Sequence, residues 1–232
     1  MFFHPLYLLF VAPALLLAAW AQLRVRSTFA AAMRMRAPMS GVDAARHILD
    51  QAGCGHVQIE ETGGMLTDHY DPRHKVLRLS SAVFHTPSLA AVGIAAHEAG
   101  HAIQDARSYA PLGLRNMAVP AAQFGPMLAI LMFVLGGLFH SAGLIWAGIA
   151  AFSGVLVFQL FNLPVEFDAS RRAREWLART GIVRTQEEAG AVSAVLDAAA
   201  WTYVAATLQA LLTLLYYVFL YWHVLAGHRD RR

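Results

Sequence analysis

The sequence predicts a mostly α-helical, multi-pass membrane protein with about four transmembrane helices and a small α+β domain. Hydrophobic residues make up 57% of the 232 residues and charged residues only 14%, whereas about 25% of a typical soluble domain is charged. Four apolar stretches are long enough to cross a bilayer, which takes about 20 residues each. We expect the two polar sections between them, residues 24–116 and 164–203, to form the small domain.

The first apolar stretch, residues 1–23, predicts an uncleaved membrane anchor. A cleaved signal peptide is the alternative, because Ala19-Trp20-Ala21 resembles a processing site. However, no positive charge precedes the stretch, and four arginines follow it: Arg24, Arg26, Arg34 and Arg36. This order of charges favours an anchor whose N-terminus lies outside the cell.

Residues 117–163 predict a helical hairpin that crosses the membrane twice. The stretch contains no charged residue, is too long for one span and has the length of two. Gly136-Gly137 and His140-Ser141 mark the turn between the two helices. The polar sections before and after this hairpin should therefore lie on the same side of the membrane.

A fourth span is expected at residues 204–226, with a basic tail at 227–232. Aromatic side chains gather near its end, as they do where a helix reaches the membrane–water interface. They are Tyr216, Tyr217, Tyr221 and Trp222.

The polar section at residues 24–116 begins with a predicted amphipathic helix. Ser40 and Asp43 form a capping box that starts the helix. The helix should run through Ala52 and end at Gly53.

Two short strands are predicted after this helix, at Val57–Glu60 and Lys75–Leu79, because apolar and polar residues alternate there. We expect Lys75–Leu79 to be an edge strand that pairs with the backbone of a bound polypeptide. The next helix should begin with Thr86 as N-cap and Pro87 in the first helical position.

That helix carries the pentapeptide His97-Glu98-Ala99-Gly100-His101. Residues four apart lie on one face of a helix, so His97 and His101 can bind one metal ion. Glu98 can then act as general base toward a water on that ion. The preceding run, residues 88–96, is almost wholly apolar, and burying two imidazoles and a carboxylate without partners would be costly. A metal site is therefore favoured over two buried histidines with an incidental glutamate.

A third metal ligand is required, because catalytic zinc sites usually have three protein ligands and one open position. Asp105 is one candidate, but ligands at positions i, i+4 and i+8 extend over about 12 Å of helix, which is too far for one ion. Glu166 is favoured over Asp105 and over a simple surface charge, because a carboxylate directly after a membrane span is costly and usually functional. Asn162 and Pro164 predict a helix start or break just before it.

Asp168 has two open interpretations. Two residues after Glu166, it points about 200° away on a helix and cannot reach the metal from regular backbone. It either pairs with Arg171 or Arg172 or orients a ligand histidine.

The chain resembles the neutral zinc metallopeptidases of bacterial membranes, the YugP-type family. The resemblance rests on AAVGIAAHEAGHAIQ, YAPLGLRN, NLPVEFDASRRA and, upstream, LTDHYDPRHKVLRLS, and it extends from about residue 41 to 202. More distantly, the layout resembles the integral-membrane proteases of the HtpX and CAAX-processing kind, which carry an aspartate where this chain has Ser170.

The resemblance implies a zincin-like, gluzincin-like membrane peptidase that holds one zinc ion per chain with His97, His101 and Glu166. Zinc would activate a water for attack on a peptide bond, with Glu98 as catalytic base. An oxyanion donor is also expected, and the chemically suitable side chains are His69, Tyr70 and Arg115. Their residue types alone do not select one, and Asp68–His74 can equally be read as a polar turn.

Two other classes of function remain to be compared with a peptidase. A non-catalytic zinc-binding membrane scaffold or assembly factor would keep the three ligands. A transporter is disfavoured, because no span interior contains Asp, Glu, Lys or Arg. Nucleic acid is not an expected partner, since the basic residues flank apolar stretches instead of forming a stripe. The expected partners are the lipid bilayer and a polypeptide substrate from a membrane or membrane-proximal protein.

The distribution of charge predicts which side the site faces. Of the 18 lysines and arginines, 15 lie in the polar sections and three lie after the fourth span. By the positive-inside rule, the site faces the cytoplasm from the bacterial inner membrane. A single cysteine, Cys54, excludes an internal disulfide.

Overall fold

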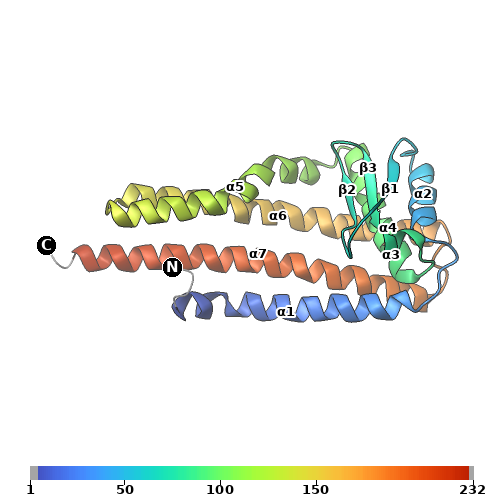
Figure 1. Cartoon of the computed structure of the whole chain (residues 1–232), viewed down its shortest axis with the longest axis horizontal. Helices are drawn as coiled ribbons and strands as arrows, with labels where there is room; N and C mark the ends of the chain where they lie inside the picture. Colours follow the sequence, from blue (N-terminus) through green and yellow to red (C-terminus); the bar gives the residue numbers. More distant parts are fainter. Residues whose placement is uncertain (1–4, 230–232) are drawn as a thin grey trace. The chain divides into compact units, whose positions relative to one another are not determined.

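The computed structural model describes residues 5–229 of the chain, with side chains as far as Trp222. Each of its four long helices contains an apolar segment long enough to cross a membrane. They are α1 (Pro5–Met33), α5 (Ala110–Leu138), α6 (Ala142–Arg179) and α7 (Gln186–Arg229) (Figure 1). The chain is thus a mostly α-helical, multi-pass membrane protein with a small α+β part, as predicted. Residues 1–4 of the predicted first span, and residues 230–232 of the predicted basic tail, lie outside the described residues.

The long helices continue past the ends of the apolar stretches. The turn between α5 and α6 lies at residues 139–141, at the predicted His140-Ser141, and His140 has a φ of 51° there. Gly136 and Gly137, which were also predicted to mark the turn, lie within α5. The predicted start or break at Pro164 is wrong, because α6 runs through this proline without interruption. A proline inside a helix costs about 3 kcal/mol. Close packing of the next turns offsets this cost, since Val165 and Ala169 are completely buried.

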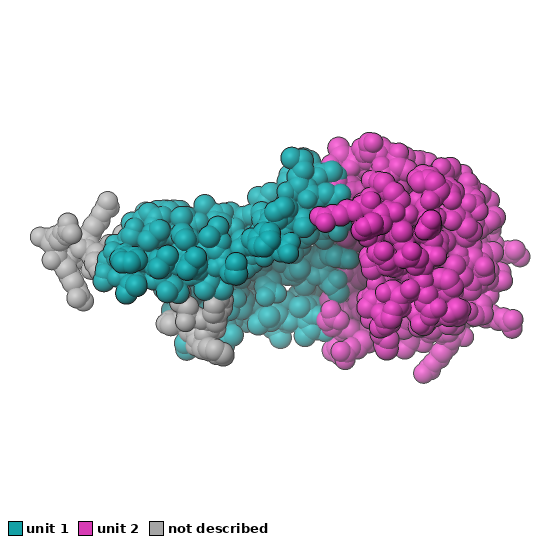
Figure 2. Space-filling view, turned by 45° about the horizontal axis from the view of Figure 1, so that its top comes forward, with its two compact units in different colours: residues 1–19, 113–163, 202–232 teal, residues 20–112, 164–201 magenta. Residues whose placement is uncertain are grey.

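The chain divides into two compact units (Figure 2). Unit 1 comprises residues 1–19, 113–163 and 202–232. Unit 2 comprises residues 20–112 and 164–201, and it includes most of both polar sections.

Aromatic side chains and close helix contacts hold unit 1 together. The ring of Tyr216 lies edge-on against Tyr7, with 5.2 Å between the ring centroids, and Tyr217 lies 4.6 Å from Phe133. A Cβ on Gly125 would lie only 2.7 Å from the Ala151 carbonyl oxygen, so this glycine permits close packing of α5 on α6. Large apolar side chains on the outside of the unit are exposed, as expected of helices that face lipid.

Several polar side chains of the unit 1 helices line one open pocket of about 260 Å³. Gln159 of α6 and Gln209 and Thr213 of α7 all line it. Polar residues of membrane spans usually face such internal spaces because lipid offers them no hydrogen bonds.

Unit 2 contains a three-stranded sheet in the order β1-β3-β2. β1 (Gln58–Thr62) pairs in parallel with β3 (Val76–Ser80), and β2 (His69–Asp71) pairs antiparallel with β3 on its other side. β3 is therefore the central strand, and the prediction that Lys75–Leu79 forms an edge is wrong. The sequence analysis missed β2, which is only three residues long and too short to show an alternating pattern.

Capping hydrogen bonds mark where two of the helices of unit 2 begin. α2 (Gly41–Gln51) starts as predicted, with the Ser40 hydroxyl accepting a hydrogen bond from the Asp43 amide. α4 (Leu89–Ala106) is capped by Ser88 instead of Thr86. The residues before Leu89 are extended, because the Pro87 carbonyl accepts a hydrogen bond from the Ala37 amide. The short α3 (Ser81–His85) precedes them.

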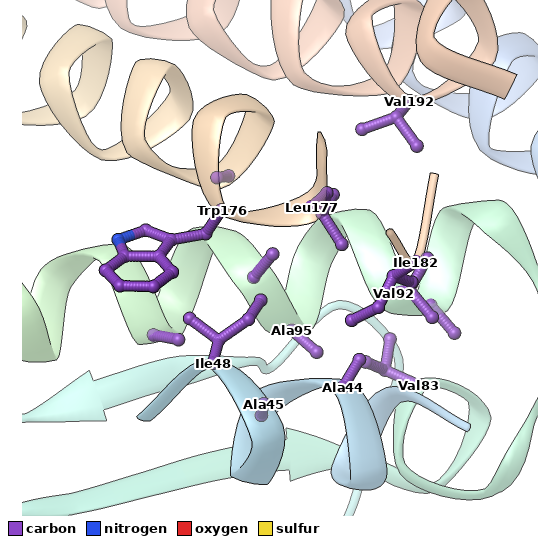
Figure 3. Close-up of a cluster of buried hydrophobic side chains, with 14 of the residues drawn as sticks. Ala44, Ala45, Ile48, Val83, Val92, Ala95, Trp176, Leu177, Ile182 and Val192 are labelled. Atoms are coloured by element: carbon purple, nitrogen blue, oxygen red, sulfur yellow. The ribbon is translucent and has the colours of Figure 1, made fainter. Parts of the chain in front are cut away.

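The core of unit 2 forms around α4. Figure 3 shows side chains from α2, α3, α4, α6 and α7 pointing into one cluster. Ile48 of α2, Val92 of α4 and Leu177 of α6 are almost completely buried in it. Apolar packing on several sides holds α4 firmly, and α4 carries the histidine motif.

Candidate metal centre

α4 places the two motif histidines one turn apart on the same face of the helix. The centroids of the His97 and His101 rings lie 4.7 Å apart, and the ring planes are nearly perpendicular. His101 is 8% exposed. This arrangement follows from the i, i+4 spacing, because such residues stack on one face.

Gly100 allows α6 to approach this face of α4. A Cβ at this position would lie 2.8 Å from the Ala169 carbonyl oxygen, a contact that real side chains do not make. The backbone of α6 can therefore lie against the motif only because residue 100 has no side chain. Glu166, three residues before Ala169, is brought to the histidines by this contact.

His97, His101 and Glu166 form one cluster. The Nε2 atoms of His97 and His101 lie 3.2 Å and 3.5 Å from the same oxygen, Oε2 of Glu166. One ligand atom from each residue lies within 4.8 Å of the other two. Ligands about 2.1 Å from one tetrahedral ion lie about 3.4 Å apart, and the two nitrogen-to-oxygen distances match this spacing. Two imidazoles and one carboxylate are also a donor set of catalytic zinc sites.

The pKa shifts within this cluster show how closely its charges interact. Glu166 lies in the part of α6 that belongs to unit 2, beyond the uncharged stretch. Burial acts to raise the pKa of Glu166, but hydrogen bonds from His101 and His97 outweigh it and hold this pKa well below its ordinary value. Burial likewise acts to lower the pKa of His101, and the contact with Glu166 raises it above the ordinary value. The carboxylate thus favours positive charge between the two rings, where a metal ion would replace a proton.

Glu98 is also buried, at 9% exposed. Among the described residues it makes no hydrogen bond or ion pair, although its charge acts on His101. Glu98 directly follows His97 in the motif, and a carboxylate without a partner is chemically able to accept a proton.

The second nitrogen of each histidine ring has a partner of its own. Nδ1 of His101 lies 3.0 Å from Oε1 of Gln104, and Nδ1 of His97 lies 3.2 Å from the Ser170 hydroxyl. Ser170 therefore contacts a ligand histidine from the position at which the HtpX-like proteases carry aspartate. Sequence reasoning missed both residues as functional, although Gln104 is one turn after His101 and Ser170 one turn after Glu166.

Of the two contacts left open for Asp168, the structure shows the pairing with Arg171 and Arg172 and no direct contact with a histidine. Its carboxylate accepts hydrogen bonds from Arg171 and Arg172. It also accepts one from the Gln104 amide, at 2.9 Å.

The other predicted residues lie outside the cluster. Asp105 is not part of it and instead accepts hydrogen bonds from the Tyr70 hydroxyl and the Lys75 ammonium group. Burial and this hydrogen bond raise the pKa of Tyr70, so its hydroxyl is committed to Asp105. His69 is exposed and bonded to the Thr67 carbonyl. Arg115 belongs to unit 1, whereas the cluster belongs to unit 2.

Comparison with known proteins identifies the family of this chain. A family model described as "Putative neutral zinc metallopeptidase" matches residues 7–222. The chain is also 43% identical over 218 residues to the "Putative membrane protease YugP" of Bacillus subtilis (strain 168), a match that covers 93% of this chain and 96% of that protein. No solved structure matches the chain significantly. With nearly its whole length matched by both, this chain belongs to the neutral zinc metallopeptidase family, the family of YugP.

Proposed function

We propose that this protein is a membrane-embedded zinc metalloendopeptidase. One observation carries the proposal: ligand atoms of His97, His101 and Glu166, from two helices, lie within 4.8 Å of one another, and the neighbouring carboxylate of Glu98 has no hydrogen-bond or ion-pair partner among the described residues. A purely structural metal site would have no need for this second, unpaired acid. A hydrolase needs one as a base.

His97, His101, Glu166 and Glu98 would have different roles in peptide hydrolysis. His97, His101 and Glu166 would hold the metal and leave one position open. Zinc, when bound, supplies Lewis acidity, which acidifies a coordinated water and polarises a carbonyl group. Glu98 would accept the proton of the attacking water and return it to the leaving amine nitrogen.

Metal analysis tests the ligand assignment. Purified wild-type protein is expected to hold one zinc ion per chain. Changing a residue that hydrogen-bonds to a metal ligand typically weakens metal binding roughly 10- to 100-fold. Glu166→Ala removes a ligand itself and should weaken zinc binding by more than this. Asp105→Ala is the matched control, because it removes a neighbouring carboxylate that lies outside the cluster, and it should keep its zinc. Loss of zinc from Asp105→Ala but not from Glu166→Ala would contradict the assignment.

The proposed substrate is a polypeptide that lies in or near the membrane, and the proposed location of the site is the cytoplasmic face of the inner membrane. The excess of arginine and lysine in the polar sections supports this orientation. Four spans then place both chain ends outside.

Reporter fusions test this orientation. Alkaline phosphatase, which is active only outside the cytoplasm, should be active when fused after Arg232 and inactive when inserted between Gly63 and Gly64 of unit 2. Green fluorescent protein, which fluoresces only inside, should show the opposite pattern. An active phosphatase at Gly63-Gly64 would place the site outside.

A further inference from the structure

Gln104 connects the two helices that carry the metal ligands. It lies on α4, three residues after His101, and its side chain is completely buried. Its amide contacts three groups: Nδ1 of His101 at 3.0 Å, the Val165 carbonyl at 2.8 Å and the Asp168 carboxylate at 2.9 Å. Gln104 therefore joins one ligand residue, His101, to the backbone directly before another, Glu166.

These contacts determine which way the amide points. A backbone carbonyl and a carboxylate can only accept hydrogen bonds, so the NH₂ group of Gln104 must face Val165 and Asp168. Its carbonyl oxygen, Oε1, must then face His101. In the reversed orientation, two acceptor oxygens would face the amide oxygen within a buried site, which is strongly unfavourable.

The direction of the amide in turn determines the state of His101. Oε1 of Gln104 can only accept a hydrogen bond, so Nδ1 of His101 must carry a proton. In a neutral imidazole, the other nitrogen, Nε2, then keeps its lone pair. Nε2 is the atom that faces Glu166 at 3.5 Å. We infer that Gln104 is a positioning residue, which holds His101 in the tautomer and orientation that bind the metal.

Asp168 and its arginines extend this arrangement. Arg171 and Arg172 both donate to the Asp168 carboxylate, which keeps Asp168 charged and turned toward the Gln104 NH₂ group. Asp168 thus acts on His101 through Gln104. The Nδ1 partners of the two rings, Gln104 and Ser170, are both neutral, so neither Nδ1 has the carboxylate partner that would make the opposite nitrogen more basic.

This inference rests on the proposed zinc site, and zinc affinity of the full-length protein in detergent tests it. Gln104→Met removes all three hydrogen bonds at nearly constant volume. We expect it to weaken zinc binding about 10- to 100-fold, the range for outer contacts of metal ligands. With cobalt(II) in place of zinc, its visible absorption should change, because the geometry around His101 is altered. Gln51→Met, which removes an exposed amide from α2, should leave both measurements unchanged.

A second variant does not change Gln104 itself. Asp168→Ala removes one of the two acceptors that orient the amide, and it should weaken zinc binding less than Gln104→Met. In the Gln104→Met background, Asp168→Ala should have no further effect, because its influence passes through Gln104. Glu175→Ala is the control, since it removes another acceptor of Arg171 without touching Gln104.

The outcomes separate this inference from the proposed function. If wild-type protein binds zinc and Gln104→Met binds it equally well, the positioning role is refuted and the zinc site remains. If Gln104→Met does not fold, unchanged zinc affinity in Asp168→Ala refutes the role instead. If wild-type protein binds no zinc, both proposals fall.

Discussion

Replacing Glu98 with glutamine should lower the rate of peptide hydrolysis by roughly 100- to 10,000-fold, the usual contribution of general acid–base catalysis. Glutamine has nearly the same shape as glutamate but cannot accept a proton from water. Zinc content should not change, because Glu98 contributes none of the three clustered ligand atoms. The measurement is cleavage of fluorescently labelled casein, as an unfolded polypeptide, by zinc-loaded protein in detergent, together with zinc content.

The matched control for this variant is Glu175→Gln, an exposed glutamate on α6, which should cleave at the wild-type rate. Cleavage by Glu98→Gln at the wild-type rate would contradict the assigned base. A zinc-binding scaffold without catalytic activity predicts a different pattern, in which wild-type protein binds zinc but hydrolyses nothing and Glu98→Gln has no phenotype.

Gly100→Ala is expected to disturb the site without changing any ligand. The added Cβ would lie 2.8 Å from the Ala169 carbonyl oxygen, so α6 must move away from α4 and carry Glu166 with it. Such overpacking typically costs about 1–3 kcal/mol, which exceeds the gain of up to about 1 kcal/mol from the higher helix propensity of alanine. We expect a lower Tm of the zinc-free protein and weaker zinc binding.

Gly190→Ala provides the matched control within unit 2. A Cβ at Gly190 of α7 meets nothing within 4 Å, so only the helix propensity of alanine acts there, and stability should stay equal or rise slightly. The explanation would be wrong if both variants had the same Tm and the same zinc affinity.

Much of the fold could be predicted from local sequence patterns. The apolar stretches marked the four spans, and the capping box at Ser40 marked the start of α2. Predictions failed where distant contacts outweighed local signals. Packing of Val165 and Ala169 carries α6 through Pro164, and pairing with Ala37 keeps the residues around Pro87 extended. β3 is central because β2, too short to be recognised from its sequence, pairs along its second edge.

The sequence by itself determined the chemistry available to this protein. The spacing of His97, Glu98 and His101 is a property of one helix, and the length of the uncharged stretch before Glu166 requires two crossings that return the chain to the same side. Only the tertiary structure decided how that chemistry is assembled. Gln104 and the Val165 carbonyl are 61 positions apart, and Ser170 and His97 are 73 apart. Contacts over such distances depend on how helices pack, including the absence of a side chain at Gly100, and no local pattern encodes them.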